Sequence, residues 1–120
     1  MKRIALVAVL MFGLTTSARA GFDEGLAAFE RGDYATALEE WLPLAEGGNA
    51  NAQYHLGFMY AVGQGVPKDN IEAHMWLSLA AAKEDAVARM TRDKLAGLMT
   101  PADISESQRL AREWLEEHGE

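Results

Sequence analysis

The stretch AQYHLGFMYAVGQGVPKDNIEAHMW, which runs from Ala52 to Trp76, carries the strongest structural signal of the chain. Its first half lacks proline and is rich in residues that favour helices. Two glycines free the backbone over residues 63–69 and Pro67 stiffens it, so this segment predicts a loop. Helix-favouring residues then resume at Asn70. The stretch therefore predicts a helix, a loop and a second helix.

Helix breakers divide the rest of the sequence in the same way. No run alternates apolar and polar residues with a period of two, so we expect no strands and assign the chain to the all-α class. Pro43 interrupts one of the helices and predicts a kink or an early stop there. We expect helices near Phe22–Arg31, Tyr34–Glu46, Ala50–Val62, Asn70–Lys83, Asp85–Met99 and Pro101–Glu117.

Apolar side chains recur three and four positions apart in these helices, which predicts a buried face on each. We assign Trp41 and Trp76 to the core, whereas Trp114 either caps the core or is left for a partner. In the fifth helix the apolar face comprises Val87, Met90, Thr91, Leu95 and Leu98.

The sequence also repeats itself with a shift of about 36 residues, a period that is typical of helical arrays. The shift aligns Asp33 with Asp69 and Ala37 with Ala73. A single helix pair cannot bury its apolar faces alone, so neighbouring pairs must cover them. The repeat therefore predicts helix pairs that stack.

This pattern resembles a Sel1-like repeat, a relative of the tetratricopeptide helical repeat. The resemblance implies a short right-handed α-solenoid of antiparallel helix pairs. It also implies a non-enzymatic module that binds a protein or peptide in the groove formed by the first helices of successive pairs. The residues that carry the resemblance are Ala52, Leu56, Gly57, Tyr60, Gly63, Gly65, Ala73 and Trp76.

The resemblance is uneven along the chain, which suggests a division into segments. Residues 21–48 form a first helix pair like that of tetratricopeptide repeats, and residues 49–84 form the Sel1-like repeat. Arg92-Asp93 stands where the Leu-Gly pair would recur, so we interpret residues 85–120 as C-terminal capping helices with a polar outer face.

The first 20 residues have the order of a secretory signal peptide. Lys2 and Arg3 precede an apolar run from Ile4 to Leu14, and Ala18-Arg19-Ala20 offers a cleavage site. The alternative is an uncleaved anchor, but the run is short for a membrane span. We therefore expect cleavage after Ala20 and a bacterial protein that is periplasmic or secreted.

Charge and cysteine content narrow the function. The chain has 11 Lys and Arg against 18 Asp and Glu, and removal of Lys2, Arg3 and Arg19 leaves 8 against 18, a net charge of about −10. This excess disfavours nucleic acids and acidic membranes and suits basic partner surfaces. The chain contains no cysteine, so we expect neither disulfides nor a lipid anchor on cysteine.

Residues suited to catalysis or metal binding are scattered. His55, His74 and His118 lack the spacing of a zinc site, and we interpret them as surface or partly packed residues. The pairs Glu39-Glu40 and Glu116-Glu117 are interpreted as solvated helix faces rather than as acid–base pairs. We therefore expect neither an enzyme nor a cofactor.

Tyr54 and Phe58 are the candidates for partner recognition. They lie four residues apart and so share one side of a helix, roughly opposite Ala52 and Leu56. This pair could be exposed for recognition or buried by the preceding helix pair, and the sequence leaves both readings open. If it is exposed, the two aromatic rings would supply apolar contact and Gln53 would contribute polar specificity.

Other classes of function also stay open at this point. The chain could be a regulatory or inhibitory accessory subunit of a cell-envelope enzyme, or a small hydrolase with a site in the groove. Self-association is a further possibility, because an incompletely capped solenoid can stack end to end.

Overall fold

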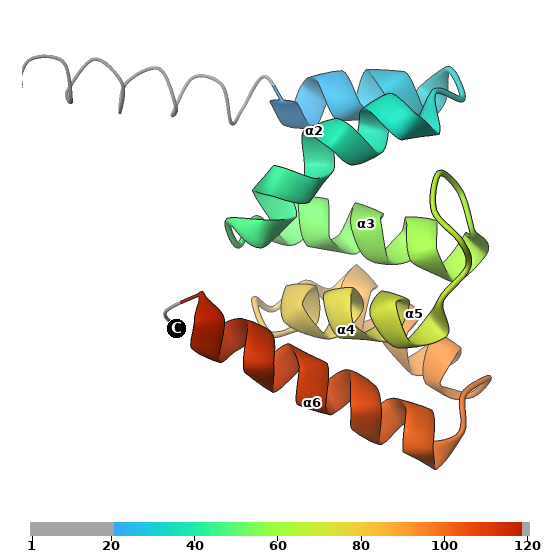
Figure 1. Cartoon of the computed structure of the whole chain (residues 1–120), viewed down its shortest axis with the longest axis vertical. Coiled ribbons are helices and arrows are strands. Elements are labelled where there is room, and N and C mark those ends of the chain that lie inside the picture. The colour runs from blue at the N-terminus through green and yellow to red at the C-terminus, as the bar shows by residue number, and fades with distance from the viewer. Residues whose placement is uncertain (1–20, 119–120) are drawn as a thin grey trace, which may run out of the picture.

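The computed structural model describes residues 21–118, and the predicted signal peptide lies outside this range. The described part contains helices and no strand, which confirms the all-α prediction. A helix over residues 21–30 is followed by α2 (Tyr34–Glu46), α3 (Ala50–Val62), α4 (Asn70–Ala81), α5 (Ala86–Ala96) and α6 (Pro101–Glu117) (Figure 1). None of these helices is long and apolar enough to cross a membrane.

Each helix from α2 to α6 begins at a side chain that caps it. Asn49, for example, accepts a hydrogen bond from the amide of Ala52 at 2.9 Å, which satisfies one of the free donors of the first turn. These local signals explain why the helix starts were predicted to within a residue. The capping residues are Asp33, Asn49, Asp69, Asp85 and Thr100.

The helix ends were predicted less well. α4 stops at Ala81, two residues before Lys83, because Glu84 adopts a left-handed conformation with a φ of 65°. α5 stops at Ala96, and the next residues form tight turns. Of the kink or early stop expected at Pro43, the early stop does not occur, since α2 continues through Pro43 to Glu46.

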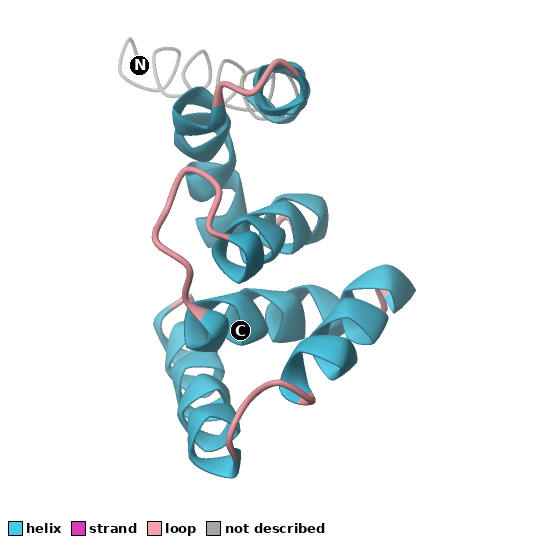
Figure 2. Cartoon of the chain, turned by 90° about the vertical axis from the view of Figure 1, so that its right-hand side faces the viewer, coloured by secondary structure: helices cyan, strands magenta, loops and turns pink. Residues whose placement is uncertain are grey.

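α4 lies at the centre of the C-terminal half. It packs against α3, α5 and α6. α5 and α6 share little contact with each other, and Figure 2 shows them diverging from the loop that joins them. The third helix pair is therefore open, unlike the tightly packed pair of α3 and α4.

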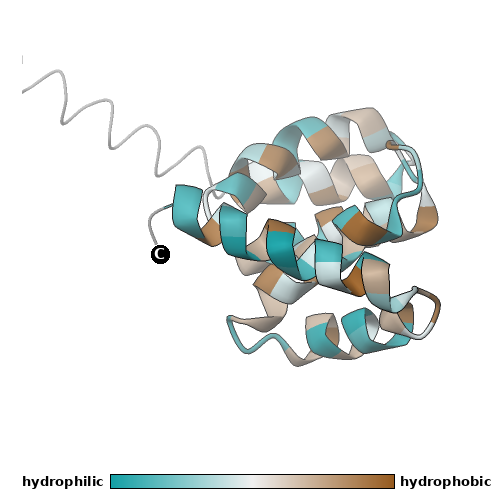
Figure 3. Ribbon diagram, turned by 60° about the horizontal axis from the view of Figure 1, so that its bottom comes forward, coloured by the Kyte–Doolittle hydropathy of each residue, from teal (hydrophilic) through white to brown (hydrophobic). Residues whose placement is uncertain are grey.

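This openness explains the error in the predicted buried face of α5. The buried residues of α5 are Ala88 and Leu95, which lie seven positions apart. Val87 and Met90 are instead 57% and 62% exposed, because α4 covers only one narrow side of α5. Leu98 lies in the turn after α5 and is 79% exposed. Figure 3 shows hydrophobic residues interspersed with hydrophilic ones along the helices.

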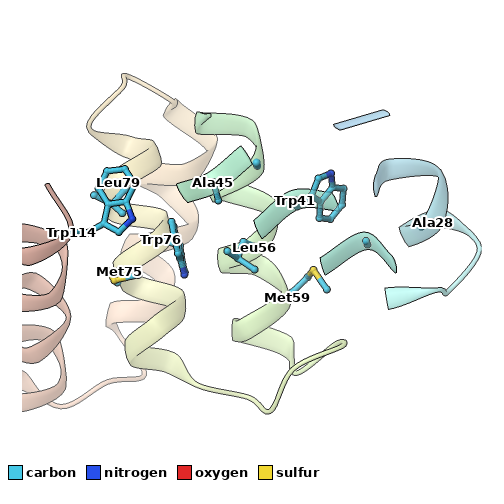
Figure 4. Packing of buried hydrophobic residues seen from close by; sticks show 11 residues of the cluster. Ala28, Trp41, Ala45, Leu56, Met59, Met75, Trp76, Leu79 and Trp114 are labelled. Atoms are coloured by element: carbon cyan, nitrogen blue, oxygen red, sulfur yellow. The ribbon is translucent and has the colours of Figure 1, made fainter. Parts of the chain in front are cut away.

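The core follows the long axis of the molecule. Side chains succeed one another from Trp41 through Leu56 and Trp76 to Trp114 (Figure 4). Trp41 is fully buried and Trp76 is 5% exposed, which confirms their assignment to the core. Trp114 is 9% exposed and contacts Trp76 edge to face at 6.1 Å, so it closes the core at the α6 end.

Gly57 lets α3 and α4 approach each other closely. A Cβ atom at this position would lie 2.9 Å from Cγ of Leu77 and 3.2 Å from the carbonyl oxygen of Ala73. The loop after α3 also depends on glycine, because Gly63 and Gly65 have φ values of 74° and 77°. The residues that carry the sequence resemblance thus build the packing and the loop of this helix pair.

Candidate functional site

One side of α3 is left open by the surrounding helices. Tyr54, His55 and Phe58 lie on this side and are partly exposed, and we refer to these three residues as the α3 stripe. The opposite side is fully buried and includes Ala52 and Leu56. The spacing of three and four residues places the three rings on one helix surface.

Neighbouring aromatic rings hold the α3 stripe in place. The ring of His55 lies 4.7 Å from that of Trp41 and 5.3 Å from that of Tyr54. Phe58 contacts Phe29 edge to face at 6.4 Å. Because these rings are ordered before any partner arrives, little side-chain entropy would be lost on binding.

Gln53 lies elsewhere than the recognition hypothesis needs. The side chain is fully buried, and its Nε2 donates a hydrogen bond to the carbonyl oxygen of Ala45 at 3.1 Å. It therefore ties α3 to the end of α2 and is absent from the open side. The helical pattern alone could not reveal this, because residue 53 lies at the border between the two sides of α3.

A pocket of about 330 Å³ lies at the other edge of the molecule, where the C-terminal ends of three helices meet. Sequence reasoning missed this site. Its only sequence signals were the predicted helix ends, and nothing in the sequence indicates that these ends converge. The lining residues are Glu46, Gly47, Gly48, Gln53, Leu79, Ala82, Lys83, Trp114, Leu115 and His118.

Two lining residues of the pocket have polar atoms without partners. Oε1 of Gln53 and Nε1 of Trp114 are buried and have no hydrogen-bond partner among the described residues. Such groups are uncommon in folded proteins. The ring of Trp114 also stacks on that of His118, with centroids 4.0 Å apart and an interplanar angle of 12°.

His74 forms a buried polar contact between α4 and α6. Its Nδ1 lies 2.7 Å from the hydroxyl of Ser107 and 3.4 Å from that of Ser78. Burial lowers the pKa of His74, and the charge of Arg92 lowers it further, while Asp93 opposes this effect. Ser107 is fully buried, so the contact fastens α6 to α4 and does not face a substrate.

A metal site needs several ligating side chains close together. No cluster of three or more His, Cys, Asp or Glu side chains occurs within residues 21–118. Glu72 is the carboxyl group whose pKa is raised, because the side chain is half-buried and close to Asp69. Among the described residues, Glu72 and the three histidines do not form a group that could hold a metal ion.

Comparison with known proteins identifies the repeat. No curated protein matches the chain. A sequence model of the Sel1 repeat matches residues 50–85 and 94–117, which together make up half of the 120 residues. The second match covers the end of α5 and all of α6, in the segment that we interpreted as capping helices. Sel1 repeats are generally modules for protein–protein interaction, and this chain belongs to the Sel1 repeat family.

Proposed function

We propose that this chain is a non-enzymatic adaptor that binds a protein or peptide along the α3 stripe. The observation that carries the proposal is the row of three partly exposed rings, Tyr54, His55 and Phe58, on the open side of α3. Family membership supports the same conclusion, because Sel1 repeats generally bind proteins.

The chemistry of the α3 stripe suits an apolar or aromatic segment of a partner. Aromatic side chains offer a large contact area with few rotatable bonds, which is why they dominate the energetic centres of many interfaces. Tyr54 adds a hydroxyl and His55 a ring nitrogen. The His55 Nδ1 atom already contacts the carbonyl oxygen of Asn51 at 2.8 Å, which fixes the orientation of the ring.

The test is capture of a partner from cell-envelope extract by the tagged chain. Replacing both Tyr54 and Phe58 by alanine should abolish capture while the helical circular dichroism spectrum is retained. The matched control replaces Val87 and Met90 by alanine, since both are exposed apolar residues of α5. If the control variant loses the partner and the Tyr54/Phe58 variant still captures it, the partner binds on α5 and the proposal is wrong.

Folding of the α3 variant decides how its result is read. If the double substitution abolishes helicity, Tyr54 and Phe58 belong to the core. A photo-reactive amino acid introduced at position 58 then gives a direct measurement, because crosslinking depends on proximity and not on the loss of a side chain. Crosslinking of the partner from position 58, and none from position 90, is the expected result.

We also propose that the chain acts in the periplasm or outside the cell. The motivation is the charged start, the apolar run and the Ala18-Arg19-Ala20 sequence within residues 1–20. Fractionation followed by intact-mass measurement tests this proposal. The mass should correspond to a chain that begins at Gly21, and recovery of the uncleaved chain from the cytoplasm would contradict it.

A further inference from the structure

The pocket of about 330 Å³ is lined by residues at the ends of several helices. The helices that end at its rim are α2 at Glu46, α4 at Ala81 and α6 at Glu117. Carbonyl groups in the last turn of a helix carry a partial negative charge, equivalent to about half an electron per helix. Three such ends at one site favour a cation.

Charged side chains of both signs line the pocket. Glu46 adds a full negative charge, and Lys83 is the permanently charged cation among the described lining residues. The Nζ atom of Lys83 bends back to donate a hydrogen bond to the carbonyl oxygen of Gly48. The chain thus already places one of its own cations against these carbonyl groups.

The unpartnered atoms define the ligand further. Oε1 of the fully buried Gln53 and Nε1 of Trp114 have no hydrogen-bond partner among the described residues, and a ligand in the pocket would reach them only after the side chains around them shift. Trp114 and His118 stack on each other, and both rings line the pocket. A guanidinium group has several donors in a plane and stacks well on aromatic rings, whereas an ammonium group is compact and more strongly hydrated.

We propose that this pocket binds the guanidinium group of an arginine presented by a partner protein. The donors of the guanidinium would meet Glu46, the helix-end carbonyl groups and Gln53, and a peptide carbonyl beside the arginine would accept from Trp114. The site is separate from the α3 stripe. The proposal rests on the adaptor function only where it assigns the arginine to a partner protein. Binding of a guanidinium group to the pocket does not require a partner protein.

Nuclear magnetic resonance tests the proposal, with a probe titrated into the isotope-labelled protein. The protein is used in the form that remains after processing by the host. The probe is Nα-acetyl-arginine amide, and the matched neutral probe is Nα-acetyl-citrulline amide, which has nearly the same shape. The indole N–H signal of Trp114, identified by its absence in Trp114→Phe, should shift saturably with the arginine probe alone. Equal shifts with both probes, or none with either, would overturn the proposal.

Two surface variants test the sign of the charge. Glu46→Gln should weaken binding of the arginine probe about fivefold, as expected for an ion pair of about 1 kcal/mol. Lys83→Gln should tighten it, because the competing cation is removed. Glu39→Gln, at an exposed position of α2 away from the pocket, should leave it unchanged. The reverse pattern would indicate an anion site and contradict the proposal.

The lysine counterpart, Nα-acetyl-lysine amide, tests selectivity for the guanidinium group. It should bind more weakly than the arginine probe, and equal binding would refute the assignment to arginine. These titrations contain no partner protein. Their failure would therefore leave the adaptor proposal standing, and loss of the α3 stripe would leave these results intact.

Discussion

Replacing Gly57 by alanine should lower the stability of the domain, although alanine is the better helix former. The gain in helix propensity is about 1 kcal/mol. The added Cβ would lie 2.9 Å from Cγ of the buried Leu77 and 3.2 Å from the backbone oxygen of Ala73, so α3 and α4 must move apart. Overpacking of this kind costs about 2 kcal/mol. The net loss is therefore about 1 kcal/mol.

Thermal unfolding followed by circular dichroism measures this effect. For a domain of about 100 residues, a loss of about 1 kcal/mol lowers Tm by about 5 °C. The matched control is Gly97→Ala, because Gly97 has a φ of −64° and a Cβ there would meet only the carbonyl oxygen of Lys94 at 3.4 Å. The control should gain about 0.5 kcal/mol.

Truncation of Leu77 provides a second test of the contact between α3 and α4. In a Leu77→Ala background the Cβ at position 57 has more room, so Gly57→Ala should cost less there than in the unchanged chain. A Tm of Gly57→Ala equal to or above that of Gly97→Ala would refute the close approach of α3 and α4 at this point.

Three further predictions concern the loop, a cap and a buried histidine. Gly65→Ala should cost about 1–3 kcal/mol, measured by urea unfolding, because residue 65 has a φ of 77° and a Cβ would lie 2.9 Å from Cβ of Tyr34. Asp69→Ala should cost about 1 kcal/mol by the same assay, whereas Asp69→Asn should cost less, because Oδ1 caps two amides of α4. Burial lowers the pKa of His74 from 6.5, so the unfolded chain takes up this proton at a higher pH than the folded chain. The contribution of His74 to stability is therefore complete above pH 6.5 and declines as the pH falls from there through the folded pKa. When the pH is lowered from about one unit above 6.5 to about one unit below it, His74→Gln should lose less stability than the unchanged chain. An equal loss in both proteins would show that another group is responsible.

Helix positions could be predicted from the sequence because their signals are local. Asn49, Asp69 and Thr100 cap helices through amides two or three residues away, so the information lies within one turn. The all-α class and the stacked helix pairs followed from these signals and from the repeat. Pro43 does not end α2, since the helix continues through it to Glu46 and Gly47 N donates a hydrogen bond to the Pro43 carbonyl.

Properties that depend on neighbouring helices could not be read in this way. α5 has apolar residues around much of its circumference, and only its packing on α4 decides that Leu95 is buried while Met90 is exposed. The burial of Gln53 likewise depends on the carbonyl of Ala45 in another helix. The pocket is the extreme case, because it joins helix ends from distant parts of the sequence, as with Glu46 and His118.

Because α4 is central, the free energy of local unfolding should differ between the two proposed binding surfaces. α6 is held mainly through α4, and α5 is joined to α4 from another side, so α6 can detach while the rest of the chain stays folded. Detachment would remove Trp114 and His118 from the pocket but leave the rings on α3 in place. Hydrogen exchange should therefore be faster in α6 than in α3. Conditions that loosen α6, such as protonation of His74, would then release an arginine ligand while a ligand on α3 stays bound.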